Sequence, residues 1–293
     1  MTDRTPHGGD TSFDAFLHMR RKAYNLVFLV LTGLATAIAL IALALILYSL
    51  VVKGIGGLDS HVFTMTQPAP DEQGGLLNAI VGSLEMCAIG MVIALVVGIL
   101  AGTWLAEYGD GTVLATVVRF LNDILISAPS ILIGLFVYQL AVRPFHGFSA
   151  LAGALALALL AMPVATRATE DIMRLQPHAL REAGMALGAN RGLVIRSIIW
   201  RASRSGLVTG GLLSFARISG ETAPLLFTSL GNPFLSYKLT QPMAALPTTI
   251  FQFAMSAYDD WQRLAWAGAL LIAVAVLATN ILGRALTGGS IKK

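Results

Sequence analysis

The segment PHALREAGMALGANRGLVIRSIIWR, residues 177–201, is the most charged run in a very apolar chain. Four of its residues are arginines, and Glu182 is its one acidic residue. Pro177 suits the first turn of a helix, and Gly188 with Asn190 suits the end of that helix. A second amphipathic stretch follows, so the segment predicts two short helices exposed to water, which need a binding partner to explain them.

Composition places the chain among membrane proteins. Of its 293 residues, 56% are hydrophobic and 12% are charged, about half the charged fraction of a soluble domain. The mean hydropathy is +0.73. The single cysteine, Cys87, lies in an apolar run, which excludes a disulfide framework and indicates no metal-ligand cluster.

Six apolar stretches approach or exceed the roughly 20 residues that cross a bilayer core. They are residues 24–52, 76–104, 113–142, 148–166, 206–230 and 264–286. We therefore expect an all-α membrane protein with six transmembrane helices. The predicted organisation is a cytoplasmic tail (1–22), a first transmembrane helix (23–52) and a membrane domain (76–286) that contains a cytoplasmic loop (170–204). Residues 231–261 are expected to form a long loop.

The distribution of basic residues predicts the orientation. Lysine and arginine concentrate in the cytoplasmic loops of membrane proteins. Here they gather in the N-terminal flank, around residues 167–204 and in the C-terminal tail. Both termini and the segment 177–201 are therefore expected in the cytoplasm.

Motifs for covalent chemistry are absent from the sequence. There is no G-x-x-x-x-G-K-[ST], H-E-x-x-H or G-x-S-x-G. We expect a chain that is not an enzyme, binds no cofactor or metal and has no nucleic-acid partner. Any ATP with its Mg²⁺ would be bound by a separate subunit.

Charged residues inside the apolar stretches are costly and commonly mark a transport pathway or an ion pair. Arg217 and Glu221, in SFARISGETAP, are four residues apart and share one helix face. They could attract an anion on its pathway or form a structural ion pair between helices. Pro224 is expected to loosen the helix beside them.

Further polar residues lie in or beside the apolar stretches. Arg167 ends the fourth stretch and could be either a gate in the substrate pathway or a positive-inside anchor. Glu85 lies within the second stretch and could face the pathway or the outer surface. Asn122 and Asp123 in the third stretch are expected to make helix-capping or loop contacts.

The charged segment resembles the EAA loop of ABC importer permeases, which reads E-A-A, three residues, G, nine residues, I-x-L-P. This chain has E-A-G at 182–184, then Gly188 and Ile198, but W-R where L-P is usual. The resemblance implies a coupling helix that docks on an ATP-hydrolysing subunit. The residues that would couple to this ATPase are Glu182, Ala183, Gly184 and Gly188.

Longer stretches resemble the PstA-type permease family of phosphate importers. These are LAEYG (105–109), NDILISAPSILIGLFVY (122–138), ARISGETAPLLFT (216–228) and QPMAALPTTIFQFAMS (241–256). The resemblance implies an ABC type-1 permease fold in the bacterial inner (plasma) membrane. It also implies three kinds of protein partner: a second homologous permease subunit, an ABC ATPase dimer and a periplasmic phosphate-binding protein. Membrane lipids would surround the chain.

The expected function is import of inorganic phosphate. Two alternatives stay open: a permease for another oxyanion, such as sulfate or molybdate, and a membrane scaffold in phosphate sensing. Fold alone does not choose among them.

Overall fold

A computed structural model describes residues 11–288. The chain forms two compact units, Met1–Val52 and Lys53–Lys293, and each is described by itself. Helix α1 (Thr11–Gly57) begins in the first unit and ends in the second. Part of the predicted tail, residues 1–10, lies outside the described residues, whereas the helix already begins at Thr11.

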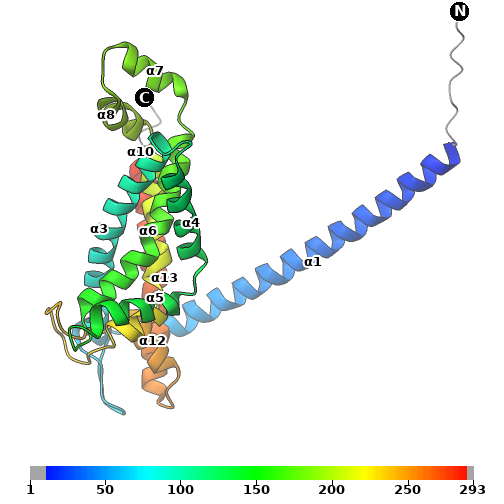
Figure 1. The fold of residues 1–293 in the computed structure, drawn as a ribbon. Coiled ribbons are helices and arrows are strands. Elements are labelled where there is room, and N and C mark those ends of the chain that lie inside the picture. Colours follow the sequence, from blue (N-terminus) through cyan, green and yellow to red (C-terminus); the bar gives the residue numbers. More distant parts are fainter. Residues whose placement is uncertain (1–10, 289–293) are drawn as a thin grey trace, which may run out of the picture. The chain divides into compact units, whose positions relative to one another are not determined.

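The elements of the second unit are helical throughout the described residues. They are α2 (His61–Thr64), α3 (Leu77–Glu107), α4 (Val113–Ser127), α5 (Ser130–Val137), the π-helical turn η1 (Tyr138–Val142), α6 (Ala150–Arg174), α7 (His178–Ala186), α8 (Arg191–Val194), the π-helical turn η2 (Ile195–Ile199), α9 (Trp200–Ala202), α10 (Arg204–Ser219), α11 (Ala223–Thr228), α12 (Leu246–Ala254) and α13 (Asp259–Gly288). Figure 1 shows α7 and α8 at one end of this bundle and α5 and α12 toward the other.

Helices α3 and α6 form the most extensive helix contact of the chain. Small residues let their backbones approach closely, as is common between helices in membranes. A Cβ atom at Gly98 would lie 2.6 Å from the Cβ of Ala165, and one at Gly90 would lie 2.9 Å from the carbonyl oxygen of Ala154. Most of the alanine-rich stretch 152–161 of α6 is buried, as this close packing requires.

Within the part of the chain that the structure describes, four helices are long and apolar enough to cross a membrane: α1, α3, α6 and α13. The predicted third span, residues 113–142, is divided into α4 and the α5–η1 segment, which are bent by 106° from one another. Pro129 explains the break, because proline lacks an N–H and disfavours helical geometry at the preceding residue. Ala128 accordingly has an extended ψ of 136°. That the chain has six transmembrane helices, and that both termini lie in the cytoplasm, remain predictions.

The predicted fifth span, residues 206–230, is also interrupted. Helix α10 ends at Ser219, and α11 begins at Ala223 with Pro224 in its first turn. The expected loosening of the helix near Pro224 is therefore confirmed. Glu221 lies in the connecting segment, where its N–H donates to the carbonyl oxygen of Ile218 (3.2 Å).

The prediction of a continuous loop over residues 231–261 is wrong. It contains α12, and α13 already begins at Asp259. Packing stabilises this short helix, because Phe253 is buried and its ring stacks on Trp261 with centroids 4.6 Å apart. Such a tertiary contact joins the helix to α13 and has no signature in local sequence periodicity.

Candidate functional site

The first candidate site is the charged segment, which folds as predicted into two short helices, α7 and α8, continued by η2. Gly188 has a φ of +82°, a left-handed conformation that favours glycine. Its N–H donates to the carbonyl oxygen of Met185 (2.9 Å), and the N–H of Ala189 donates to that of Gly184 (3.3 Å). These two bonds form a Schellman motif that ends α7.

The second half of the segment begins with a side-chain cap. Asn190 Oδ1 accepts a hydrogen bond from the N–H of Leu193 (2.8 Å). Gly184 is buried between α7 and this second half. A Cβ there would lie 2.8 Å from Val194 Cγ2 and 2.9 Å from Ile198 Cδ1. This close packing gives a physical reason for glycine where the EAA motif has its second alanine.

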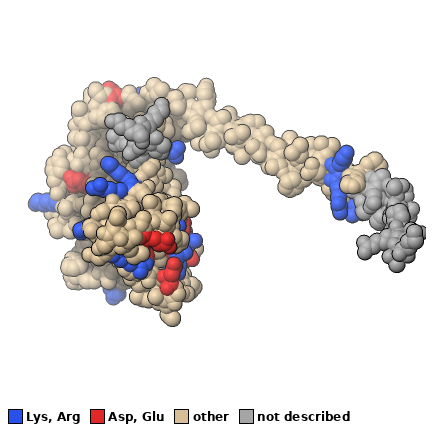
Figure 2. All heavy atoms as spheres, turned by 90° about the horizontal axis from the view of Figure 1, so that it is seen from above, with Lys and Arg blue, Asp and Glu red and all other residues tan. Residues whose placement is uncertain are grey.

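The remaining motif residues, Glu182, Ala183 and Gly188, are exposed. Large apolar side chains beside them are exposed as well, with Leu187 at 88% the most extreme. The others are Leu180, Met185 and Leu193. An apolar surface of this kind on a polar end of a protein favours an interaction with a protein partner. Figure 2 looks onto this end and shows basic and acidic side chains close together around it.

A buried ion pair supports the segment from below, and sequence reasoning missed it. Arg181 of α7 pairs with Glu107, the last residue of α3, with 2.5 Å between Nη2 and Oε1. Arg191 of α8 donates to the carbonyl oxygen of Glu107 and lies over the Tyr108 ring, 4.6 Å from its centroid. The sequence offered one signal for this ion pair. Acidic residues occur in LAEYGD at the end of the second apolar stretch, and the arginine-rich loop is predicted on the same side of the membrane.

A second ion network lies beside this pair. Glu170 of α6 accepts a hydrogen bond from Arg119 Nε of α4 (2.8 Å) and pairs with Arg174 (3.2 Å). Arg174 also binds Asp110 (2.8 Å). Glu170 is almost completely buried, so its two arginines compensate a charge that burial would otherwise make costly. Charged groups from α4, α6 and the end of α3 are thereby held together.

The second candidate site is the pair Arg217–Glu221, whose side chains approach to 3.1 Å. The structure thus brings the two predicted residues together across the break after α10. The Glu221 side chain is 10% exposed, whereas that of Arg217 is 47% exposed. An arginine within a membrane avoids lipid and faces protein or a water-filled cavity. The open side of Arg217 therefore favours contact with a pathway or a neighbouring subunit.

The other predicted residues lie apart from this pair. Arg167 forms its ion pairs with Asp123 (3.7 Å) and Asp171 (3.5 Å), linking α6 to α4. Asn122 Nδ2 donates to the carbonyl oxygen of Pro163 (3.1 Å), which is a helix-to-helix contact. Glu85 Oε2 is buried and has no hydrogen-bond partner among the described residues.

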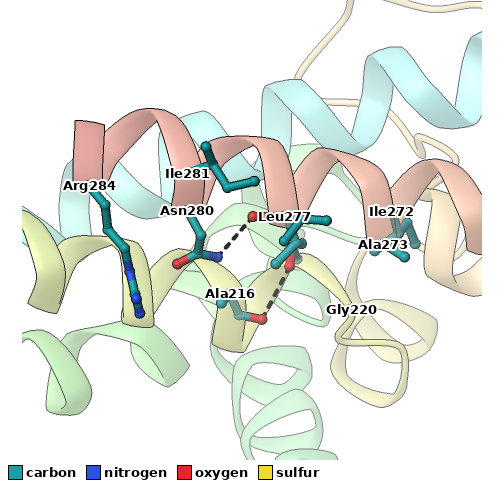
Figure 3. Close-up of a pocket in the computed structure, with 10 residues that line it drawn as sticks. Ala216, Gly220, Ile272, Ala273, Leu277, Asn280, Ile281 and Arg284 are labelled. Atoms are coloured by element: carbon teal, nitrogen blue, oxygen red, sulfur yellow. Dashed lines mark hydrogen bonds between the residues drawn. The ribbon is translucent and has the colours of Figure 1, made fainter. Parts of the chain in front are cut away.

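A cavity of about 570 Å³ lies between α10 and α13 (Figure 3). Apolar residues such as Ile272, Leu277 and Ile281 form much of its wall. Asn280, Ser219 and Arg284 are its polar side chains, and the first two bond to carbonyl oxygens of their own helices at 2.8 and 3.2 Å. Neither Arg217 nor Glu221 is among its lining residues, so this cavity is separate from the charged pair.

Within residues 11–288 no group of histidine, cysteine or acidic side chains is arranged to hold a metal ion. The fold is that of an ABC type-1 permease. It matches a solved chain of the MetNI methionine ABC transporter in inward-facing conformations, with a TM-score of 0.61 at 18% identity. That match covers 73% of this chain and 95% of the other.

The chain belongs to the family of binding-protein-dependent transport system inner membrane components, whose model matches residues 94–289. It is therefore a multi-pass protein of the inner membrane, a transport subunit and not an enzyme. Membership in this ABC importer family implies association with an ATPase and a binding protein.

Similar curated proteins cover nearly the whole chain. A phosphate transport system permease protein PstA of Haemophilus influenzae is 52% identical over 90% of this chain and 94% of its own length. A protein of the same name from Yersinia pestis is 51% identical over 91% and 90%. A probable phosphate transport system permease protein PstA of Methanocaldococcus jannaschii is 35% identical over 86% and 89%.

Proposed function

We propose that this chain is a permease subunit through which an ATP-driven importer moves inorganic phosphate into the cell. The observation that carries this proposal is sequence similarity. Over about nine-tenths of the chain, about half of the aligned residues are identical to those of proteins named as phosphate permeases. The complex would contain a second homologous permease, an ATPase dimer that binds ATP and Mg²⁺, and a periplasmic phosphate-binding protein.

The segment α7–α8 is proposed to dock on the ATPase. Its exposed apolar side chains, Leu187 above all, would be buried in a groove of that subunit, as amphipathic helices are in other complexes. ATP binding would close the ATPases and move this segment. The membrane helices would then change between outward-open and inward-open arrangements, and hydrolysis would reset them.

Arg217 is proposed to attract phosphate on its pathway. Its charge is partly balanced by Glu221 at 3.1 Å, so the attraction for an anion is weakened. Transport requires this balance, since binding must be strong enough for entry and weak enough for release. Arg167, with two acidic neighbours, is the weaker candidate for the same pathway.

The substrate is tested by uptake into liposomes that hold the complete complex with ATP on its cytoplasmic side. Labelled phosphate is expected to accumulate only with ATP and the binding protein, and excess sulfate or molybdate should not compete. Competition by either of these anions as strong as that by unlabelled phosphate would favour an importer of another oxyanion. A complex that assembles and hydrolyses ATP without moving any of these anions would favour a sensing scaffold.

Docking is tested by Gly188→Ala. Alanine at the φ of +82° is strained by about 1–2 kcal/mol, so the end of α7 should shift. We expect a several-fold loss of uptake, with either weaker ATPase association or more ATP consumed per phosphate. Co-purification and paired uptake and hydrolysis assays measure these effects.

The matched control is Gly192→Ala, because Gly192 lies in the same segment with a negative φ and only one atom, Asn190 Oδ1, within 4 Å of a new Cβ. This variant should behave like the wild type. Equal behaviour of the two alanine variants would contradict a docking role that depends on the shape of α7. Substitution of the exposed Glu182 is expected to act in the same direction as Gly188→Ala.

A further inference from the structure

One guanidinium group, that of Arg181, bonds from the segment α7–α8 to the ends of two membrane helices. Arg181 lies in the middle of α7, and its side chain is only 15% exposed. Its Nε lies 3.0 Å from Glu107 Oε2, and its Nη2 lies 2.5 Å from Oε1. Such two-point pairing of guanidinium and carboxylate sets orientation as well as distance.

The same guanidinium also binds the end of α6. Its Nη1 donates to the carbonyl oxygen of Gln176 (2.8 Å), and its Nη2 donates to that of Met173 (2.9 Å). Met173 lies in the last turn of α6 and Gln176 lies two residues after its end, so these bonds fasten Arg181 to the C-terminal end of α6. A single side chain of α7 therefore joins the C-terminal ends of α3 and α6.

The second half of the segment reaches the same turn of α3. Arg191 of α8 donates to the backbone carbonyl of Glu107 and lies over the Tyr108 ring. Further along, Trp200 Nε1 donates to Thr103 Oγ1 (3.2 Å), one turn before Glu107. Both halves of the segment are thus attached to the last turns of α3.

Close packing makes α3 and α6 suited to move as one body. Gly98 and Gly102 of α3 lie directly against Ala165, Thr166 and Thr169 of α6, leaving no room even for a methyl group. Packed interfaces of this kind transmit strain because they are not continuously deformable. A displacement of α7 must therefore move both helices or break the contacts of Arg181.

We propose that Arg181 and Glu107 form the clamp that transmits the movement of the α7–α8 segment to the α3–α6 pair. Arg181 is then a positioning residue for transport, and it lies outside the EAA-like motif. This proposal rests on the function proposed above, in which a partner ATPase moves α7. It assigns the mechanical connection to a pair of residues 74 positions apart in the sequence.

The test uses the complete complex in liposomes and measures phosphate uptake and ATP hydrolysis in the same vesicles. The variant Arg181→Gln leaves Glu107 buried without its cation and could fail to assemble. The double variant Glu107→Gln/Arg181→Gln removes both charges and keeps assembly measurable. We expect the double variant to use about tenfold more ATP per phosphate than the wild type, within the usual range of coupling between sites.

Two comparisons separate coupling from stability. Arg181→Lys keeps the charge but loses the planar two-point contact, so its ratio of ATP to phosphate should be intermediate. Arg174→Gln changes an arginine of the neighbouring network, which forms ion pairs with Asp110 and Glu170 rather than with α7. Its ratio should equal that of the wild type.

The outcomes are distinct for the two proposals. An assembled double variant with the wild-type ratio would overturn the clamp alone, as would uptake and hydrolysis that fall in equal proportion. Wild-type vesicles that take up no phosphate would overturn the proposed function and the clamp with it. A raised ratio in the double variant, with wild-type behaviour of Arg174→Gln, would support the clamp.

Discussion

Arg217→Gln is expected to reduce phosphate uptake by about thirtyfold or more while the complex still assembles. Truncation of one partner of a buried charge pair costs about 2–5 kcal/mol, and the half-exposed Arg217 is expected at the lower end of this range, which corresponds to about thirtyfold. Glutamine retains polarity and approximate size, so the principal loss is the positive charge that would attract the anion. The measurement is ATP-dependent uptake of labelled phosphate, with subunit co-purification as the test of assembly.

A second variant decides between the two interpretations of the pair. If Arg217 and Glu221 form only a structural ion pair, Arg217→Gln/Glu221→Gln should restore uptake, because no buried charge is left without a partner. If Arg217 attracts phosphate, the double variant should assemble and remain inactive. Arg143→Gln is the control, since Arg143 is an exposed arginine that bonds to Gln139 (3.1 Å) away from the pair.

Gly98→Leu is expected to have the second large effect, on stability. Even a Cβ at this position would lie 2.6 Å from the Cβ of Ala165, and the rest of a leucine must displace α6. Overpacking of this kind costs about 1–3 kcal/mol and sometimes more. The apparent Tm of the purified complex should fall by several degrees, and the yield in membranes should drop.

Two variants show whether the α3–α6 contact causes that loss. Gly56→Leu is the matched control within the second unit, because no described atom lies within 4 Å of a Cβ there, and it should leave the Tm unchanged. The milder Gly98→Ala should be partly rescued by Ala165→Gly, which removes the nearest opposing atom. Equal Tm values for Gly98→Leu and the wild type would contradict the packing described here.

The boundaries of the charged segment could be predicted because their causes are local. Gly188 ends α7 through its own backbone conformation, and Asn190 caps the next helix through a bond three residues away. Arg217 and Glu221 could be paired for the same reason, since they are four residues apart on a helix. In each case the deciding interaction lies within one turn.

The breaks in the membrane segments were predictable only in part. Pro129 and Pro224 mark where helices lose hydrogen bonds, but a proline does not specify whether its helix bends or continues. Pro163 lies inside α6, which continues through it, whereas the chain turns by 106° beside Pro129. Asn122 was expected to make a helix-capping or loop contact, and it instead joins α4 to α6 by bonding to the carbonyl oxygen of Pro163.

Composition and charge were sufficient to predict a membrane protein, and local sequence patterns were sufficient to predict the two-helix segment. Neither prediction depends on contacts between distant residues. The connection of that segment to the membrane helices could not be obtained in this way. Arg181 and Glu107 meet across 74 positions, and α12 is stabilised by a ring on α13. Such contacts depend on how helices pack in three dimensions, which periodicity along one helix does not encode.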